Sequence, residues 1–357
     1  MSDRIRVGVV GTGWWATQFH LPSLLRNPNV AVTAVADPAP QRLQKADQHF
    51  GIKASFSDAR ELFASGLVDA VIIATPHATH YGLVKAALEH DLHTLCEKPF
   101  VLESKQGYEL LRIARERSLH LMVGYTYQFT RHARLVRDMV RQGRIGELLL
   151  VSGLFASMVE AYYRARPGEY APVFQFPVFG PDARTYSDPS LSGGGQAQTQ
   201  ITHAMNMVLW VTGRRASEVH AYMQRRDLAV DLVDGIAYRF DNGALGTMSS
   251  TGSLQPGQPQ QQELRYYGTR GYILQEMIHG KVSFCGNDGA VETAPDLTAE
   301  EVYPAGAVSA GFVDVIRGVG DNPADAQTAV ATVGFLEAAY RSAATHAPVA
   351  VEDSGKS

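Results

Sequence analysis

The first 125 residues alternate between continuous apolar runs and segments of helical periodicity, and this alternation restricts the possible folds more than any other feature. The apolar runs are rich in valine, isoleucine and leucine and occupy residues 5–10, 30–37, 68–75, 92–98 and 119–125. Helical stretches such as 78–91 and 103–118 separate them. Continuous apolar runs of this length indicate parallel strands with both faces covered. The pattern predicts an α/β domain with a doubly wound parallel sheet.

The rest of the chain has a different pattern of apolar residues. Two-residue apolar alternation, typical of half-exposed antiparallel strands, recurs at 218–227, 235–250 and 263–276, and Asp241-Asn242-Gly243 is a hairpin signal. An irregular stretch rich in proline and aromatic residues, 162–192, precedes a helical segment at 196–212. Because the chain is too long for one ordinary core, we expect two domains, 1–125 and 126–357. The second should be an α+β domain with a mainly antiparallel sheet and a C-terminal helix, about 326–345, that packs back.

Composition argues against several classes of function. The 357-residue chain has a formal net charge of −4, whereas a duplex-binding protein needs a cationic surface. The apolar runs are shorter than the roughly 20 residues of a membrane span, and no signal sequence is recognisable. The two cysteines, Cys96 and Cys285, are too far apart to suggest a disulfide framework. We expect a cytoplasmic protein with neither nucleic-acid nor membrane partners.

The first apolar run leads directly into Gly11-Thr12-Gly13-Trp14-Trp15-Ala16, which fits the dinucleotide-binding pattern G-x-G-x-x-G/A. In this pattern the first glycine makes a tight turn and the second lets the backbone approach a pyrophosphate, while the third small residue allows close packing of helix and strand. The two tryptophans are compatible with it if their side chains point away. An ordinary loop is the alternative, but the position between a strand and a helix favours a dinucleotide.

Asp37 ends the second apolar run, a little beyond the spacing of about 20 residues expected for a ribose-binding acid. A carboxylate there accepts hydrogen bonds from ribose hydroxyls and repels a 2′-phosphate. This favours NAD over NADP as the cofactor, although Arg42 lies nearby in sequence. The alternative for Asp37 is a turn former ahead of Pro38.

Further motifs resemble those of the glucose–fructose oxidoreductase / inositol dehydrogenase / MocA (Gfo/Idh/MocA) family over nearly the whole chain. They are Ala74-Thr-Pro-x-x-x-His80, Glu97-Lys98-Pro99, Gly143-Arg-Ile-Gly146-Glu147, Gly193-Gly-Gly195 eight residues ahead of His203, and Glu337-Ala-Ala-Tyr-Arg-Ser342. The resemblance implies a Rossmann domain followed by an α/β domain with a large open sheet that often forms dimer or tetramer contacts. A homodimer or homotetramer is therefore expected.

The same resemblance implies a cofactor site, residue by residue. The pyrophosphate would lie against Gly11, Thr12, Gly13, Trp14 and Trp15, and the adenosine ribose against Asp37. The nicotinamide side would be formed by Thr75, Pro76, His80, Glu97 and Lys98, together with Gln128 at a position that often shows arginine in the family. A cis peptide before Pro99 is also implied.

Lys98 is the predicted acid/base. Hydride loss from an alcohol requires removal of the hydroxyl proton, and the reverse reaction requires a proton donor. A lysine that is partly desolvated near a cationic nicotinamide has its ammonium form disfavoured, so it can act as a base near neutral pH. The alternative is a surface salt bridge between Lys98 and Glu97.

His203 follows three glycines on a predicted helix and is expected to orient the substrate hydroxyl, a core histidine being the alternative. Many family members carry an aspartate four residues before this histidine. Here the residue is Thr199, which can hydrogen-bond a hydroxyl but cannot act as a base. Arg164 and Tyr186 of the irregular stretch are further candidates for binding the substrate, the arginine suiting an anionic sugar derivative.

The predicted function is NAD-dependent oxidation of a carbinol in a sugar, cyclitol or sugar derivative. The alternative is an NAD-dependent glycosidase, in which transient oxidation acidifies a neighbouring C–H, the aglycone leaves, water adds and the hydride returns. Tyr127 or His203 would then be the carbon base. A non-catalytic nucleotide sensor is disfavoured because it needs no proton-transfer group. No metal site is predicted, since His77 and His80 have no carboxylate or cysteine nearby in sequence.

Overall fold

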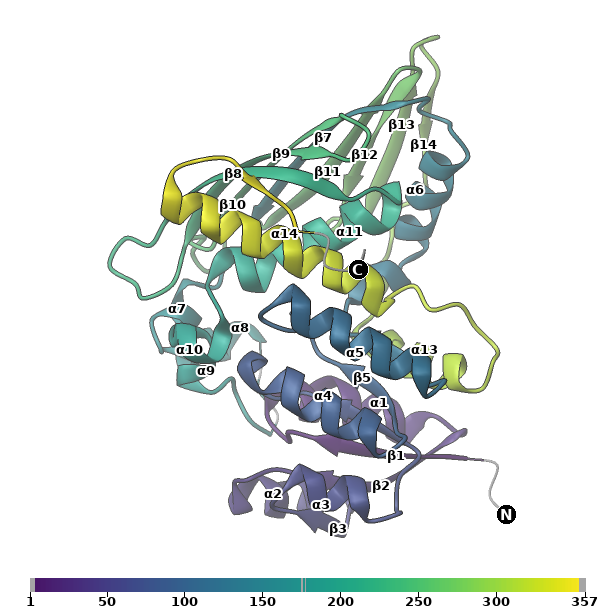
Figure 1. Ribbon diagram of the computed structural model, residues 1–357, viewed down its shortest axis with the longest axis vertical. Coiled ribbons are helices and arrows are strands. Elements are labelled where there is room, and N and C mark those ends of the chain that lie inside the picture. The colour runs from purple at the N-terminus through teal and green to yellow at the C-terminus, as the bar shows by residue number, and fades with distance from the viewer. Residues whose placement is uncertain (1–3, 175, 177, 353–357) are drawn as a thin grey trace.

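The two β-sheets of the computed structural model, which describes residues 4–174, 176 and 178–352, lie towards opposite ends of its long axis (Figure 1). Strands up to residue 123 form one sheet, and strands from residue 148 onwards form the other. The long helix α14 (Ala326–Thr345) runs between them and contacts both α5 (Ser104–Glu116) of the first part and β8 (Ala216–Gln224) of the second.

Six parallel strands form the first sheet, in the order β3-β2-β1-β4-β5-β6. Their bounds are Ile5–Val10 (β1), Val30–Ala36 (β2), Ala54–Phe56 (β3), Ala70–Ile73 (β4), His93–Cys96 (β5) and Leu121–Val123 (β6). The strand order reverses direction between β1 and β4, so the predicted doubly wound parallel sheet is confirmed. β3 is absent from the apolar runs of the sequence because a three-residue strand gives no periodic pattern.

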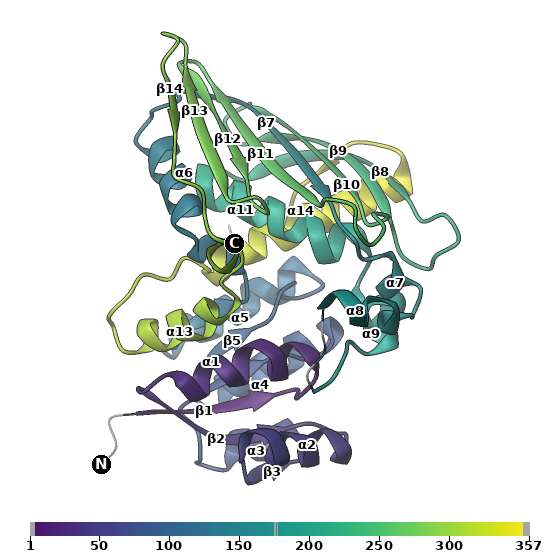
Figure 2. The same cartoon turned by 180° about the vertical axis from the view of Figure 1, so that it is seen from behind.

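Helices cover both faces of this sheet, as the two opposite views show (Figures 1 and 2). Besides α5, they are Leu21–Arg26 (α1), Pro40–Phe50 (α2), Ala59–Ala64 (α3), His80–Glu89 (α4) and Ala305–Ile316 (α13). α4 and α5 lie nearer the viewer in Figure 1, and α1 and α13 do so in Figure 2. This two-sided cover explains why the strands read as continuous apolar runs.

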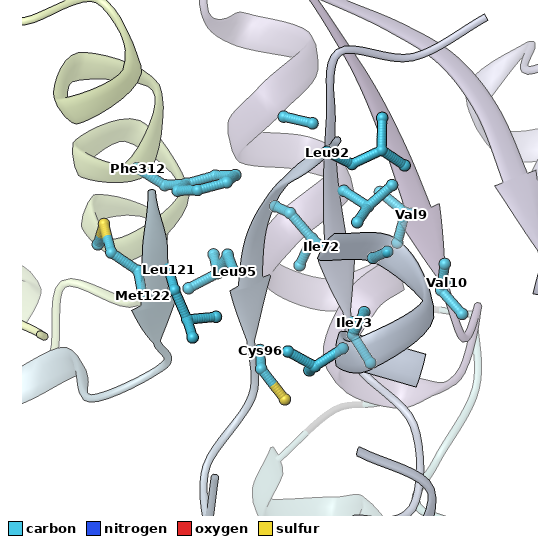
Figure 3. Packing of buried hydrophobic residues seen from close by; sticks show 14 of the residues in the cluster. Val9, Val10, Ile72, Ile73, Leu92, Leu95, Cys96, Leu121, Met122 and Phe312 are labelled. Atoms are coloured by element: carbon cyan, nitrogen blue, oxygen red, sulfur yellow. The ribbon is translucent and has the colours of Figure 1, made fainter. Parts of the chain in front are cut away.

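The core of the first sheet includes residues from the far end of the chain. Ile72 and Leu95 are fully buried on adjacent strands, and Phe312 of α13 packs over the same cluster (Figure 3). Residues from the start of α14, such as Ala329 and Val330, belong to it as well. The division of the chain into 1–125 and 126–357 stays a prediction, because part of the second segment completes the core of the first.

The second sheet has nine strands, in the order β14-β13-β12-β11-β7-β10-β9-β8-β15. In addition to β8, their bounds are Leu148–Ala156 (β7), Val233–Phe240 (β9), Leu245–Thr251 (β10), Gln261–Gly268 (β11), Gly271–Glu276 (β12), Lys281–Gly286 (β13), Val291–Thr293 (β14) and Val349–Ala350 (β15). Only β7 and β10 pair in parallel, so the predicted, mainly antiparallel sheet is confirmed. The expected hairpin turn joins β9 to β10, with Gly243 at φ +87°.

One face of the second sheet carries helices and the other is bare. α6 (Arg131–Arg141), α11 (Thr202–Thr212) and α14 lie on the covered face (Figures 1 and 2). The bare face exposes large apolar side chains: Leu149, Tyr222 and Leu245 are 53%, 67% and 51% exposed. Within the described residues, no helix is both long and apolar enough to cross a bilayer.

The irregular stretch after β7 folds into short helical turns beside the first glycine-rich loop. They are Glu160–Tyr163 (α7), Pro167–Tyr170 (η4), Ala171–Phe174 (α8), Ala183–Ser187 (α9) and Pro189–Ser192 (α10). Other short elements are Ala16–His20 (η1), His77–Thr79 (η2), Thr126–Phe129 (η3), Ala197–Ile201 (η5) and Ala299–Val302 (α12). Tyr162 and Tyr170 anchor the stretch in a small buried cluster that Trp14 also contacts. The stretch therefore borders the same cleft as the first sheet.

Candidate active site

A cleft of about 810 Å³ opens at the carboxyl ends of β1, β4 and β5, between the two sheets. Residues that line it include Gly11, Gly13, Asp37, Thr75, Pro76 and Lys98 from the first part of the chain, and Phe155, Tyr163, Tyr186, Thr199 and His203 from the second. β1 and β4 are the strands between which the winding reverses. In doubly wound sheets this switch point is where ligands bind.

The glycine-rich turn at the end of β1 leaves space where a phosphate would lie. Gly11 has φ +85°, and a Cβ there would approach the Ala74 carbonyl oxygen to 2.4 Å. A Cβ at Gly13 would enter open space, with Arg42 Nη1 the nearest atom at 3.9 Å. The helix begins at Trp14, as predicted, so its free N–H groups face this space. The turn thus fits a dinucleotide.

The two tryptophans do not point away from the cleft as the sequence pattern suggests. Both line it, and Trp15 Nε1 donates to Glu97 Oε1 at 3.0 Å. The indole of Trp14 meets that of Trp15 edge-on, with ring centroids 5.3 Å apart. Trp15 is held on the cleft side by Glu97, which lies far away in sequence. Trp14 donates to the nearby Gln18 and also contacts the rings of the distant Tyr162 and Phe176.

Asp37 lies at the end of β2 and is 3% exposed. Its Oδ2 accepts from Thr12 N at 2.9 Å, and its Oδ1 accepts from Ala39 N at 2.9 Å. The bond to Ala39 is the turn-forming role, whereas the ribose-binding role of Asp37 stays a prediction. Thr12 itself is buried and does not line the cleft. Arg42 Nη1 is 3.7 Å from Asp37 Oδ2.

Lys98 reaches the cleft from the loop after β5, where the Lys98–Pro99 peptide is cis. Its Nζ donates to the Thr199 carbonyl oxygen at 3.1 Å, which ties the two parts of the chain together. Burial lowers the pKa of Lys98 to about 8, against the opposing effect of the Glu97 carboxylate. The group can therefore lose and regain a proton near neutral pH.

Glu97 is buried and engaged by other groups. Its Oε1 lies 2.9 Å from His20 Nε2 and accepts from the Trp15 indole, while Oε2 accepts from Lys98 N at 3.0 Å. A surface salt bridge between Glu97 and Lys98 does not describe this arrangement. The carboxylate instead fixes the backbone from which the lysine side chain extends.

His203 lies in the first turn of α11, directly after the π-helical turn η5. It is 6% exposed, lines the cleft, and its Nδ1 has no hydrogen-bond partner in the described structure. Burial, with a smaller contribution from the Lys98 charge, holds the pKa of His203 well below its usual value. The ring stacks on Phe155, at 11° between planes, and meets the edge of Tyr127. A neutral imidazole that lines the cleft and has one unpartnered, buried nitrogen is not a satisfied core histidine.

Two hydroxyl groups of the cleft wall are already bound within the protein. Thr199 Oγ1 lies 2.6 Å from the hydroxyl of Tyr163. The hydroxyl of Tyr127 donates to Gln262 Oε1, and burial raises the pKa of Tyr127 well above its usual value. Tyr127 therefore keeps its proton and is a poor candidate for a carbon base.

Besides Thr12, three predicted site residues lie away from the cleft. His80 is fully buried, with its ring nitrogens against the carbonyl oxygens of Thr75, Pro99 and Phe100, so it braces two cleft loops from behind. Gln128 donates to Asn206 Oδ1 at 2.5 Å inside the protein. Arg164 is held between Glu160 and Asp227 at 2.7 and 2.8 Å and does not line the cleft.

Several cleft residues cannot be identified from the sequence. Tyr303, Gln262 and Phe155 line the wall near Lys98 and His203 but belong to no motif. They come from the loop after α12, from β11 and from β7, respectively, and only their proximity in the folded chain identifies them. No group of three or more potential metal ligands occurs among the described residues.

A doubly wound sheet with a glycine turn at its switch point defines a dinucleotide-binding fold, and its cleft also contains a buried lysine and a neutral histidine. Comparison with known proteins specifies this class further. The family model described as "Oxidoreductase family, NAD-binding Rossmann fold" matches residues 5–125, and the "GFO/IDH/MocA C-terminal domain" matches residues 133–274. The chain belongs to the Gfo/Idh/MocA family of oxidoreductases.

Relatives span the whole length of the chain. The rhizopine catabolism protein MocA of Rhizobium meliloti is 27% identical over 342 residues, which cover 94% of each chain. An inositol 2-dehydrogenase of Corynebacterium glutamicum is 31% identical over 156 residues, covering 43% of this chain and 46% of that one. An Agrobacterium radiobacter oxidoreductase, solved with NAD+, L-tartaric acid and magnesium, superposes with a TM-score of 0.78 at 21% identity over 98% of both chains.

Proposed function

We propose that the chain is an NAD-dependent dehydrogenase that oxidises a secondary alcohol of a sugar, cyclitol or related ring compound. The observation that carries the proposal is the pairing of Lys98, with its pKa lowered to about 8, and a neutral His203 on one cleft wall at the switch point of an NAD-binding fold. Dehydrogenases of cyclitols and reductases of sugars among the relatives support this substrate class.

Lys98, His203 and Thr199 have different proposed roles in the reaction. When bound, NAD supplies the hydride acceptor, with its pyrophosphate at the Gly11–Gly13 turn. Lys98 as the free amine takes the proton of the substrate hydroxyl, and as the ammonium it returns a proton in the reverse reaction. His203 lines the same cleft and positions this hydroxyl through its imidazole. Thr199 contributes its carbonyl oxygen, which orients the lysine.

NAD is proposed in preference to NADP because Asp37 forms part of the wall where the adenosine ribose would lie. A buried carboxylate repels a 2′-phosphate there. Arg42 could offset that repulsion, but it is shared between Asp37 at 3.7 Å and Asp182 at 3.6 Å. Calorimetric titration of the protein with both coenzymes tests this: the expected result is tighter binding of NAD, and tighter binding of NADP contradicts it.

The dehydrogenase proposal is tested by incubating the protein with NAD and a panel of cyclitols, aldoses and glycosides while NADH absorbance is followed. Stoichiometric NADH from at least one compound is the expected result, and Lys98→Met should abolish it while coenzyme affinity is retained. A protein that binds NAD but forms no NADH with any of these compounds would contradict the proposal.

A redox-neutral glycosidase is the second candidate, with His203 as its carbon base. His203 lines the cleft and is neutral, so it can accept a proton from carbon next to a transiently formed ketone, although its lowered pKa makes it a weak base. Tyr127 lacks this capacity because its hydroxyl donates to Gln262 and retains its proton. Release of the aglycone from a chromogenic glycoside without net NADH would favour this candidate, and stoichiometric NADH would favour the dehydrogenase.

We also propose that the protein is a homodimer or homotetramer. The bare face of the second sheet exposes Leu149, Tyr222 and Leu245, and association would remove this apolar surface from water. Light scattering during size-exclusion chromatography measures the mass directly. A monomer at micromolar concentration would contradict the proposal.

A further inference from the structure

A continuous series of aromatic rings follows one wall of the cleft. Each ring meets the next with centroids between 5.1 and 6.3 Å apart, in the order His203, Tyr127, Tyr303, Trp15, Trp14 and Tyr162. All six residues line the cleft. We call this series the ring belt. Rings that face a cavity offer flat apolar surface, which binds other flat apolar groups with little need for hydrogen bonds.

Charge is scarce along the ring belt. The charged residues that line the described cleft are Asp37, Arg42, Asp58, Glu97, Lys98 and Asp182. Arg42 lies close to Asp37 and Asp182 at the end where β2 stops, away from Lys98. Glu97 is occupied by Trp15, His20 and the Lys98 backbone. Apart from the reacting amine, nothing described on this wall would stabilise a carboxylate, sulfate or phosphate on the substrate.

Two hydroxyls next to the ring belt already have partners in the protein. The hydroxyls of Thr199 and Tyr127 are bound to Tyr163 and Gln262. At the two ends of the ring belt, Nδ1 of His203 and the hydroxyl of Tyr162 have no partner among the described residues, and both atoms are covered by protein. A substrate with hydroxyls on every side would leave many of them unpaired against the rings, which is costly. One that places an apolar ring against the belt would not.

We infer that the site takes an uncharged ring alcohol that carries a flat apolar ring, as an aryl glycoside does. Its carbinol lies against Lys98 and His203, and its apolar ring lies against Trp15 and Tyr303 of the ring belt. The position of the carbinol rests on the function proposed above. The inference adds the class of substrate, and it excludes both free sugar acids and small, fully hydroxylated cyclitols as preferred ligands.

The test measures binding to the NADH-loaded protein by calorimetry, because this form cannot oxidise the alcohol. The probes are methyl and phenyl β-glycosides of glucose, galactose and xylose in matched pairs, together with phenyl β-D-glucuronide. Burial of a phenyl ring against aromatic side chains is expected to tighten binding by about tenfold or more in at least one pair. The glucuronide should bind at least about tenfold more weakly than the matched phenyl glucoside, because no cation compensates its desolvation.

Variants show whether the preference arises at the ring belt. Tyr303→Leu should reduce the phenyl-over-methyl ratio to about threefold or less, because the aromatic surface is lost. Tyr303→Phe retains the ring and should retain the ratio. Tyr81→Leu, on α4 and outside the cleft, is the matched control and should leave the ratio unchanged. NAD affinity, measured for each variant, identifies a variant that has lost its fold.

Three outcomes would overturn the inference: equal affinity within every pair, no detectable binding of any phenyl glycoside, or a preference for the glucuronide. Failure of the proposed function is distinguishable, because binding is measured without turnover. A retained phenyl preference with no NADH and no aglycone released would defeat the catalytic proposal alone. NADH formed from methyl and phenyl glycosides of equal affinity would defeat this inference alone.

Discussion

The ionisation of Lys98 predicts a particular pH dependence for alcohol oxidation. Burial lowers the pKa of Lys98 from 10.5 to about 8, even though the neighbouring Glu97 carboxylate acts in the opposite direction. At pH 7 about a tenth of this amine is in the free-base form, whereas an ordinary lysine has only about one molecule in 3,000 in that form. The structure therefore provides about 300 times more base at neutral pH than an exposed lysine would.

The assay measures kcat/KM for oxidation of an alcohol substrate at each pH from 6 to 10. Because the free amine is the active form, kcat/KM should rise about tenfold per pH unit below pH 8 and level off above about pH 9. The reduction direction needs the ammonium form and should lose rate above the same pH. An oxidation profile that still rises steeply at pH 10 would refute the claim that burial tunes this lysine.

Two substitutions of Lys98 distinguish the loss of proton transfer from the loss of charge or of side-chain volume. Lys98→Arg keeps a positive charge but cannot lose its proton, and Lys98→Met keeps the volume without a charge. Both should lower kcat by a factor of about 10² to 10⁴, the usual contribution of a general acid or base. NAD affinity, followed by calorimetry, should change by no more than about threefold. Activity within tenfold of the parent in either variant would exclude Lys98 as the acid/base.

Three further predictions concern other parts of the site. Gly11→Ala places a Cβ 2.4 Å from the Ala74 carbonyl oxygen at φ +85°, so it should lower the free energy of unfolding by about 2 kcal/mol or more in denaturant titration and weaken NAD binding. Asp37→Ala should raise the ratio of NADP to NAD in kcat/KM by about tenfold, since it removes the charge that repels a 2′-phosphate; an unchanged ratio would exclude that role. Arg164→Ala should leave KM within twofold for neutral and anionic substrates, because its guanidinium pairs with Glu160 and Asp227 outside the cleft; a large rise in KM for an anionic substrate alone would contradict this.

The fold could be predicted from sequence to the extent that local pattern determines it. Continuous apolar runs with glycines at 11 and 13 are sufficient for a doubly wound sheet, because burial on both faces removes the alternation of an ordinary strand. β3 is too short to produce such a signal, and the packing of Phe312 into the first core depends on a contact between residues far apart in the chain. Contacts between residues that are far apart in the chain cannot be predicted from local sequence patterns.

The candidate site divides in the same way. The motifs around Lys98 and His203 predict that both side chains belong to the active site, and the structure brings both to one cleft. The motifs also suggest Gln128 and Arg164, which local partners hold elsewhere: an asparagine in the core and two carboxylates at the surface. A residue type can indicate a chemical capacity, but competition among nearby partners determines whether that capacity faces a ligand.

By itself, the sequence determined the parallel sheet, the glycine turn and the presence of a lysine and a histidine suited to proton transfer, because each of these is encoded in a short stretch of chain. Only the tertiary structure decided that Trp15 and Tyr303 face the cleft together, that Arg164 does not, and that Lys98 is buried enough for its pKa to fall to about 8. These properties depend on desolvation and on neighbours contributed by distant segments, and both exist only once the chain has folded.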